Sequence, residues 1–387
     1  MELDPDGSIL RGLGYETLGN LLDYPVSAHP KVDPETGNLL FHSYAVDPEL
    51  IRSSGNLKVG EYDEGSGRLL SYYGVRTPDG TSSFGHDMTF TPKWFVLYDS
   101  SLKFDSAQIF NETGNVLSFS ERSTFKIGLV PRRGGGDGDM KDDGDYDDSD
   151  PPPSSDDVLW FDTGKVRAVI HPLNSWEEED GTVILWAPSS DYFSLDMNGQ
   201  SEPFHMTEFR LCPRTGTVET QVIDSTYNVE FPRVRDDHMG KFARLGTAGI
   251  LDQSLGGDGL FSGFTVWDMS ERRLRSAVLY RDGDVGGEPA IIPKPDTAGS
   301  DEFYVGTFLY GTGDGESYFA LYDGETADCV ARIRLPHRVP FGFHCAWLSG
   351  EQIGRHRDHH DREKRKREEK VESKKGGTKG EGGGGSE

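Results

Sequence analysis

Short stretches of alternating apolar and polar residues, each closed by a turn, constrain the fold of this 387-residue chain more than any other feature. They recur along most of the sequence, as in NLLFHSYAV at 38–46, GTVILWAPSS at 181–190 and DEFYVGTFLYGTG at 301–313. β-Branched and aromatic residues fill them, and Gly, Asp or Pro bound them, which is typical of half-buried β-strands. The 49 Gly and 21 Pro residues suit many tight turns and disfavour long helices. We therefore expect an all-β fold.

A similar hairpin phrase occurs three times along the chain. The three copies are VDPETGNLL at 32–40, LCPRTGTVET at 211–220 and YDGETADCVARI at 322–333. Each predicts the outer hairpin of a four-stranded antiparallel unit. Repeated units of roughly 40–50 residues indicate a β-propeller, although several β-sandwich domains would give a similar alternation. The dipeptide Trp267–Asp268 is isolated and does not indicate a WD40 repeat.

Acidic residues outnumber basic ones by 66 to 40, which gives a formal net charge of −26. Binding to nucleic acid requires a basic surface, so we expect no nucleic-acid partner. Residues 134–157 hold ten Asp and show no apolar periodicity, which predicts a disordered acidic insertion. Residues 351–387 are charged and then Gly-rich, and we expect them to form a low-complexity, disordered tail.

The cysteine content and the apolar runs bear on location. Cys212, Cys329 and Cys345 are too few and too scattered for a disulfide framework or a zinc site. The sequence contains no run of about 18 apolar residues that could span a membrane, and its start lacks the pattern of a signal peptide. An intracellular location is therefore expected.

Four histidines stand next to predicted strands, in turn-rich surroundings. They are His29, His86, His171 and His344, and the successive gaps of 57, 85 and 173 residues are too wide for one local metal motif. Such gaps suit ligands that different propeller blades deliver to a central axis. Taken singly, each could equally be a hydrogen-bonded histidine of the core. The other histidines of this region are expected to be structural or surface residues: His42, His205, His238 and His337.

Several longer phrases carry a family resemblance, in a fixed order along the chain. They are LDYPVSAHPKVDPETG, HDMTFTPKWFVLYD, FKIGLVPRR, HPLNSWEEEDG, NVEFPRV, GEPAIIPKP and VPFGFH. From about Leu3 to about Leu348 the chain resembles the carotenoid cleavage oxygenases, which include stilbene-cleaving dioxygenases and retinoid isomerohydrolases. The resemblance implies a seven-bladed β-propeller with a non-haem Fe(II) ion on its axis.

The resemblance also implies roles for particular residues. The four iron ligands would be His29, His86, His171 and His344. Glu230 and Glu288 would each accept a hydrogen bond from the nitrogen of a ligand histidine that does not face the metal. Such a hydrogen bond fixes the tautomer of the ring. The family usually has Gly after the last ligand, where this chain has Cys345, and we expect that side chain to pack as a small hydrophobe.

The implied reaction is the addition of O2 across a conjugated carbon–carbon double bond of a carotenoid or apocarotenoid, which gives two carbonyl products. No catalytic residue is expected beyond the metal centre. The candidate walls of a substrate tunnel, for which core packing is the alternative, are Phe41, Phe84, Met88, Phe231 and Phe341. A peripheral membrane contact could involve apolar residues of the segment 106–126, namely Ile109, Phe110, Val116, Leu117 and Phe119.

Two alternatives stay open at this point. A stilbene could replace the polyene as substrate, or the chain could be an inactive propeller. Family members carry a long segment, with the opening blades, before the phrase GYETLGNLLDYPVSAHPK, which here begins close to the first residue. We therefore expect an N-terminally truncated, partial propeller over residues 1–350, with a cytoplasmic or plastid location and any targeting segment lying upstream.

Overall fold

The computed structural model describes residues 2–3, 9–11, 18, 21–44, 56–80, 83–104, 117–132, 155–194, 201–252, 260–281, 283–297, 299–340, 342 and 344–354. The chain divides into two units, one made of Asn20–Cys345 and the other of Met1–Gly19 with Ala346–Glu387. In the second unit β1 (Glu2–Leu3) pairs antiparallel with β2 (Ile9–Arg11), and residues 350–354 are helical. Among the described residues no helix has the length and hydropathy needed to cross a membrane.

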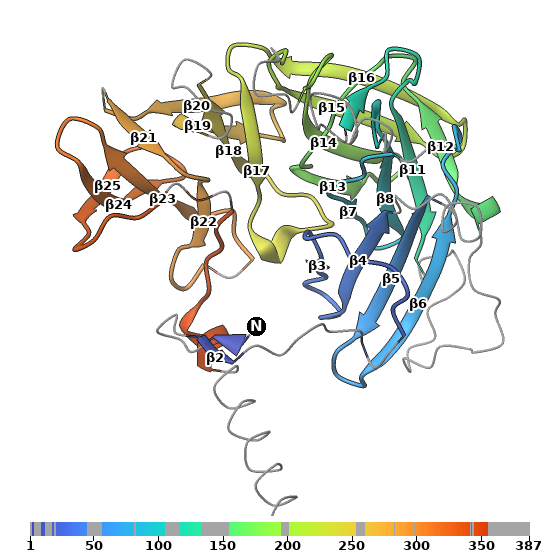
Figure 1. The fold of residues 1–387 in the computed structure, drawn as a ribbon, viewed down its shortest axis with the longest axis horizontal. Helices are drawn as coiled ribbons and strands as arrows, with labels where there is room; N and C mark the ends of the chain where they lie inside the picture. The colour runs from blue at the N-terminus through green and yellow to red at the C-terminus, as the bar shows by residue number, and fades with distance from the viewer. Residues whose placement is uncertain are drawn as a thin grey trace, which may run out of the picture. The chain divides into compact units, whose positions relative to one another are not determined.

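The unit Asn20–Cys345 is built from five antiparallel blades within its described residues (Figure 1). Blade 1 contains β3 (Lys31–Val32), β4 (Leu39–Tyr44), β5 (Leu57–Asp63) and β6 (Arg68–Val75). Blade 2 contains β7 (Thr89–Phe90), β8 (Trp94–Asp99), β11 (Lys126–Pro131) and β12 (Leu159–Asp162). Blade 3 contains β13 (Asn174–Glu177), β14 (Val183–Ser189), β15 (His205–Cys212) and β16 (Thr217–Asp224).

The last two blades are joined into one sheet by the pairing of β19 with β21. Blade 4 contains β17 (Val229–Arg233), β18 (Leu245–Leu251), β19 (Phe261–Asp268) and β20 (Arg273–Leu279). Blade 5 contains β21 (Asp284–Gly286), β22 (Ala290–Pro293), β23 (Phe303–Gly311), β24 (Glu316–Asp323) and β25 (Cys329–Arg334), and both β21 and β22 pair with β23. The smaller elements are β9 (Leu102–Phe104), β10 (Leu117–Phe119), η2 (Ser155–Asp157) and η3 (Asp236–His238).

This arrangement confirms the all-β, propeller-type prediction. The described residues supply five blades, two fewer than the seven that the resemblance implies. One detail was wrong: the hairpin at 32–40 joins β3 to β4, the first two strands of a blade, whereas those at 211–220 and 322–333 join the last two. The predicted acidic insertion and tail lie almost wholly outside the described residues.

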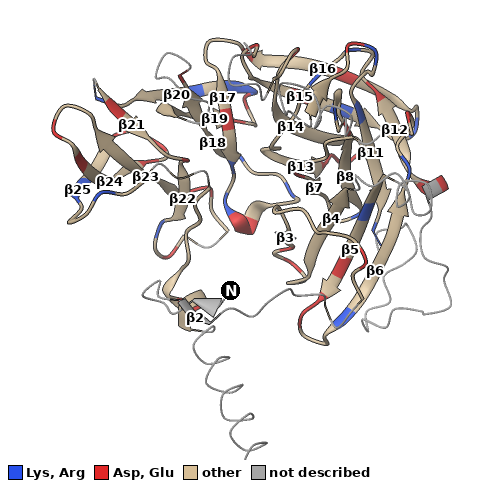
Figure 2. Ribbon diagram, viewed as in Figure 1, with Lys and Arg blue, Asp and Glu red and all other residues tan. Residues whose placement is uncertain are grey.

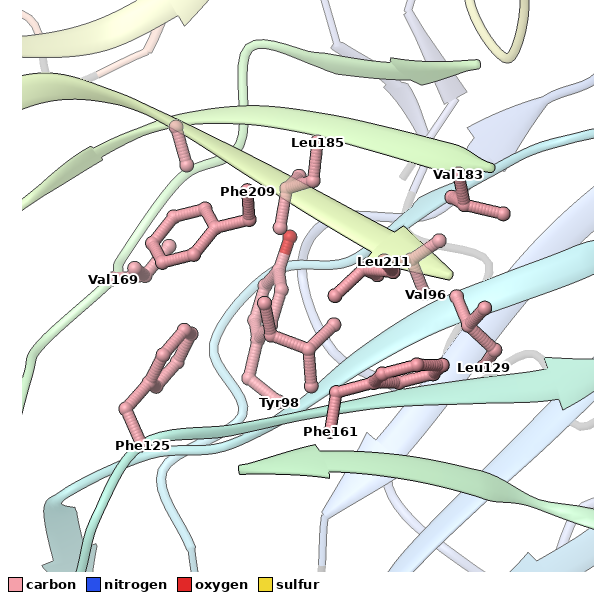
Figure 3. Close-up of a cluster of buried hydrophobic side chains, with 12 residues drawn as sticks. Val96, Tyr98, Phe125, Leu129, Phe161, Val169, Val183, Leu185, Phe209 and Leu211 are labelled. Atoms are coloured by element: carbon pink, nitrogen blue, oxygen red, sulfur yellow. The ribbon is translucent and has the colours of Figure 1, made fainter. Parts of the chain in front are cut away.

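Apolar side chains that alternate along the strands bind the blades face to face. Between blades 2 and 3, Tyr98, Phe125 and Phe209 lie in one cluster of fully buried residues (Figure 3). Antiparallel pairing of β8 with β11 puts Tyr98 opposite Ile127, so both point into this interface. Truncating a buried Phe to Ala typically costs about 3–5 kcal/mol. Equivalent clusters fill the other three interfaces between consecutive blades.

Charged side chains are spread over all five blades (Figure 2), and one buried group joins two of them. The guanidinium of Arg132, which follows β11, donates to Asp33 at 2.8 Å and to Glu61 at 2.9 Å. Arg132 is only 6% exposed, and it also donates to the carbonyl of Thr91. Blades 1 and 2 are therefore fixed against each other by a buried ion-pair group.

Candidate metal centre

The first strand of each blade begins close to one residue that carries a nitrogen or oxygen ligand. His29, His86 and His171 lie two or three residues before β3, β7 and β13. In blade 4, Glu230 is the second residue of β17, and in blade 5, Glu288 lies two residues before β22. The spacing is 57 residues from His29 to His86 and 59 from His171 to Glu230. The longer interval between His86 and His171 contains the acidic segment 134–157.

The fold brings four predicted site residues together: His29, His86, His171 and His344. One ring nitrogen of each lies within 4.8 Å of the corresponding nitrogens of the other three. Nε2 of His29 is 3.0 Å from Nε2 of His86, which is close to the spacing of two nitrogens about 2.1 Å from a shared ion at a right angle. The rings of His171 and His344 meet edge to face, with centroids 5.0 Å apart.

His171 is held by a buried carboxylate. Its Nδ1–H donates to Oε2 of Glu230 at 2.8 Å, and Nε2 is buried without a partner among the described residues. Burial opposes the charged ring, but the negative charge of Glu230 and this hydrogen bond raise the pKa of His171 above its usual value. The Glu230 carboxylate also accepts the peptide N–H of Phe231, whose φ of 55° turns the backbone toward it.

His344 has a looser carboxylate partner. Its Nδ1 lies 3.4 Å from Oε2 of Glu288, and that carboxylate also accepts from Arg233 and from the backbone N–H of Cys345. Burial alone would raise the pKa of Glu288, but these positive and hydrogen-bonding partners hold it below its usual value. Burial, followed by the charge of Glu288, raises the pKa of Cys345 to about 12, so the thiol stays protonated at neutral pH.

His29 and His86 are kept neutral by their surroundings. Burial, with a smaller contribution from the neighbouring histidines, lowers the pKa of His29 to about 3 and that of His86 to about 4. Ring lone pairs are therefore available at neutral pH. The sequence reasoning missed Asp87, which is 4% exposed, bonds Lys31 at 2.7 Å and lies 3.9 Å from Nδ1 of His29. The sequence did hold a signal for this pair, because a charged residue stands close to each of two candidate ligands where a buried strand begins: Lys31 after His29 and Asp87 after His86.

The predicted tunnel residues occupy different places. Phe84 stacks on His86 with centroids 5.1 Å apart, and Phe231 lies 4.9 Å from the rings of both His171 and His344. Phe41 instead covers Gly60 and contacts Tyr72. Met88 is fully buried in the core between blades 1 and 2. Phe341 lies outside the described residues, as do Ile109, Phe110 and Val116.

Two cavities border the histidines. One is polar and is lined by His29, His171 and His344 together with Lys31, Asp87 and Arg233. The other has a volume of about 180 Å³, lies beside His344 and Cys345, and is lined mainly by the apolar groups of Phe308, Leu309, Val339 and Pro340. The centre is therefore bordered by a cavity lined with charged groups and by a mainly apolar one.

The donor set fits a transition-metal ion. Four imidazoles converge, Nε2 of His171 is buried with no hydrogen-bond partner in the described part of the chain, and no carboxylate belongs to the group of four. Imidazole suits iron, copper, nickel and zinc, whereas calcium and magnesium require oxygen ligands.

The sequence profile of the RPE65 family, described as retinal pigment epithelial membrane protein, matches residues 1–349. The chain belongs to this family. It is 25% identical over 362 residues to the carotenoid 9,10(9′,10′)-cleavage dioxygenase 1 of Arabidopsis thaliana, covering 89% of this chain and 61% of that protein. It is 26% identical over 350 residues to the zeaxanthin 7,8(7′,8′)-cleavage dioxygenase of Crocus sativus, covering 86% and 85%. The chain thus spans about three fifths of the length of the first curated relatives it matches.

Solved structures share the fold. The lignostilbene dioxygenase of Pseudomonas brassicacearum matches with a TM-score of 0.72 and 22% identity, covering 89% of this chain and 70% of that one. A cobalt-substituted apocarotenoid oxygenase of Synechocystis matches with a TM-score of 0.69 and 22% identity, covering 90% and 70%. At this level of identity the likeness supports the propeller architecture, and the chemistry must be argued from this chain's own residues.

Proposed function

We propose that this chain carries the metal centre of a non-haem Fe(II)-dependent dioxygenase that cleaves a conjugated double bond of a carotenoid or apocarotenoid. The observation that carries the proposal is the convergence of four imidazoles, with one ring nitrogen of each within 4.8 Å of the others. The metal would be held by His29, His86, His171 and His344. When bound, Fe(II) would supply the activation of O2 for addition to the alkene.

The reaction balances without a coenzyme. One carbon–carbon double bond breaks, each of its carbons gains one oxygen atom from O2, and the alkene supplies the electrons. No side chain has to transfer a proton, so Glu230 and Glu288 act by holding the rings of His171 and His344 in one tautomer and orientation. The Cys345 thiol instead donates to the backbone carbonyl of Glu288 at 3.2 Å and does not belong to the group of four ligand atoms.

The apolar surroundings favour a hydrophobic substrate. Phe84 and Phe231 lie against the histidine rings, and an apolar cavity of about 180 Å³ opens beside His344. Such walls exclude water and hold a flat conjugated chain against the centre. The names of the plant relatives, which specify carotenoids, agree with this choice. A peripheral membrane contact and an intracellular or plastid location remain predictions.

The test combines metal analysis with product detection. Purified chain loaded anaerobically with Fe(II) is exposed to air with β-carotene, a β-apocarotenal or resveratrol, and products are separated by chromatography with mass detection. We expect about one iron per chain and an aldehyde or ketone pair from a carotenoid or apocarotenoid. Cleavage of resveratrol alone would refute the substrate class, and absence of iron binding would refute the metal centre.

A further inference from the structure

His86 is anchored through its backbone. Among the described residues no carboxylate pairs with the His86 ring, unlike the rings of His171 and His344. The peptide groups beside it are held instead. Nε2–H of His42 donates to the carbonyl of Gly85 at 2.7 Å, and the hydroxyl of Ser27 donates to the carbonyl of His86 at 2.5 Å.

These contacts form a network that also includes the segment carrying His29. The backbone N–H of Ser27 donates to the carbonyl of His42 at 2.9 Å, and Ser27 lies two residues before His29. The His42 side chain on β4 and the Ser27 side chain before β3 therefore donate hydrogen bonds to the carbonyls of Gly85 and His86. In this arrangement Nε2 of His86 lies 3.0 Å from Nε2 of His29.

The chemistry of His42 favours a dedicated role over simple packing. Its side chain is 1% exposed and faces the core between blades 1 and 2, on the same side of β4 as Leu40 and Tyr44. Because the carbonyl of Gly85 can only accept, the ring proton lies on Nε2. Nδ1 is then a buried acceptor with no partner among the described residues. An unsatisfied polar atom is costly in a core, and Phe would avoid that cost but could not donate to Gly85.

We propose that His42 is a positioning residue for the metal centre, which with Ser27 fixes the peptide groups on either side of His86 so that its ring faces His29. This inference rests on the proposed function, because it assigns His42 to the ligation of a metal by the four histidines. His42 itself does not touch the metal or the substrate.

The test measures Co(II) affinity by competition with a chromophoric chelator, together with the visible absorption of the bound cobalt. The variants are His42→Phe, which removes the donor, His42→Gln, whose amide N–H can reach the same carbonyl, and Ser27→Ala. The matched control is Ser43→Ala: Ser43 is the next residue on β4, is 0% exposed, and its hydroxyl has no partner among the described residues. Thermal unfolding of each variant is followed in parallel.

We expect His42→Phe and Ser27→Ala to weaken cobalt binding roughly tenfold and to change the absorption spectrum, the lower end of the effect of losing a residue that orients a ligand. His42→Gln should recover most of the affinity, and Ser43→Ala should match the unaltered chain. If His42→Phe does not fold, Ser27→Ala decides. Unchanged affinity and spectrum in the folded variants, or no recovery with His42→Gln, would overturn the inference. Failure of the unaltered chain to bind cobalt would overturn the proposed function instead.

Discussion

The two halves of the candidate centre are held by different means. His171 and His344 each face a buried carboxylate, from Glu230 and Glu288. His29 and His86 have no carboxylate within hydrogen-bonding distance of their rings among the described residues, and contacts from Ser27 and His42 hold the backbone of His86 instead. Blades 4 and 5 carry Glu230 and Glu288 near the start of a strand, and these carboxylates contact His171 and His344.

The largest expected loss of metal affinity comes from removing a ligand histidine that faces a buried carboxylate. His171→Ala should weaken Co(II) binding by about two to three orders of magnitude, which is the loss of one ligand out of four if the binding free energy is on the order of the 10–16 kcal/mol of structural zinc sites. Equilibrium competition with a chelator measures the change. His205→Ala is the control, because His205 lies on β15 outside the group of four histidines, and its Nδ1 contacts the carbonyl of Tyr227. Equal losses in the two variants would show that the effect is not specific to the centre.

A smaller loss should follow from neutralising the carboxylates. Glu230→Gln keeps the shape of the side chain but removes the charge that orients and polarises His171, so metal affinity should fall roughly 10- to 100-fold. Glu288→Gln should cost less, because its contact with His344 is longer, at 3.4 Å against 2.8 Å. The same competition titration ranks the two variants. A larger loss for Glu288→Gln would contradict the ranking that the distances give.

Asp87→Asn should produce the smallest change in metal affinity, below about threefold, because 3.9 Å from His29 is too long for a hydrogen bond. Its main effect should be on stability. Asp87 is 4% exposed and pairs with Lys31, and breaking a buried pair costs about 3–5 kcal/mol.

Denaturant unfolding of the metal-free chain measures this cost. Lys93→Ala is the control: its pair with Glu177 spans 4.0 Å and is partly exposed, so the cost should stay below about 1 kcal/mol. If Asp87→Asn lost as much metal affinity as Glu230→Gln, the proposed difference between the two halves would be wrong.

The sequence predicts the propeller-type architecture and the four histidines better than it predicts the residues that hold those histidines in place. Alternating strands and repeated hairpins indicate a propeller-type fold, and phrases such as AHPKVDPETG and HPLNSWEEEDG pick out His29 and His171. Glu230 and Glu288 follow from the same resemblance, and the fold brings both beside histidines. These residues are identifiable because each lies in a distinctive phrase at the start of a blade.

The supports of His29 and His86 depend on packing between blades, which no local pattern reveals. Asp87 follows His86 in sequence, yet its partner Lys31 belongs to blade 1. His42 looks like a core residue of β4, and only the packing of blades 1 and 2 shows that its ring meets Gly85. The sequence gives no reason to distinguish Phe41 from Phe84 as a candidate tunnel residue. In the structure Phe84 stacks on His86, whereas Phe41 contacts Tyr72.

X-ray absorption spectroscopy of the chain loaded with Co(II) tests the central claim most directly. It reports both the number and the type of atoms bound to cobalt. The proposed centre predicts one cobalt per chain with four imidazole ligands, and three in His171→Ala if binding is forced at high cobalt concentration. A spectrum dominated by oxygen ligands, or one that His171→Ala leaves unchanged, would contradict a four-histidine metal centre.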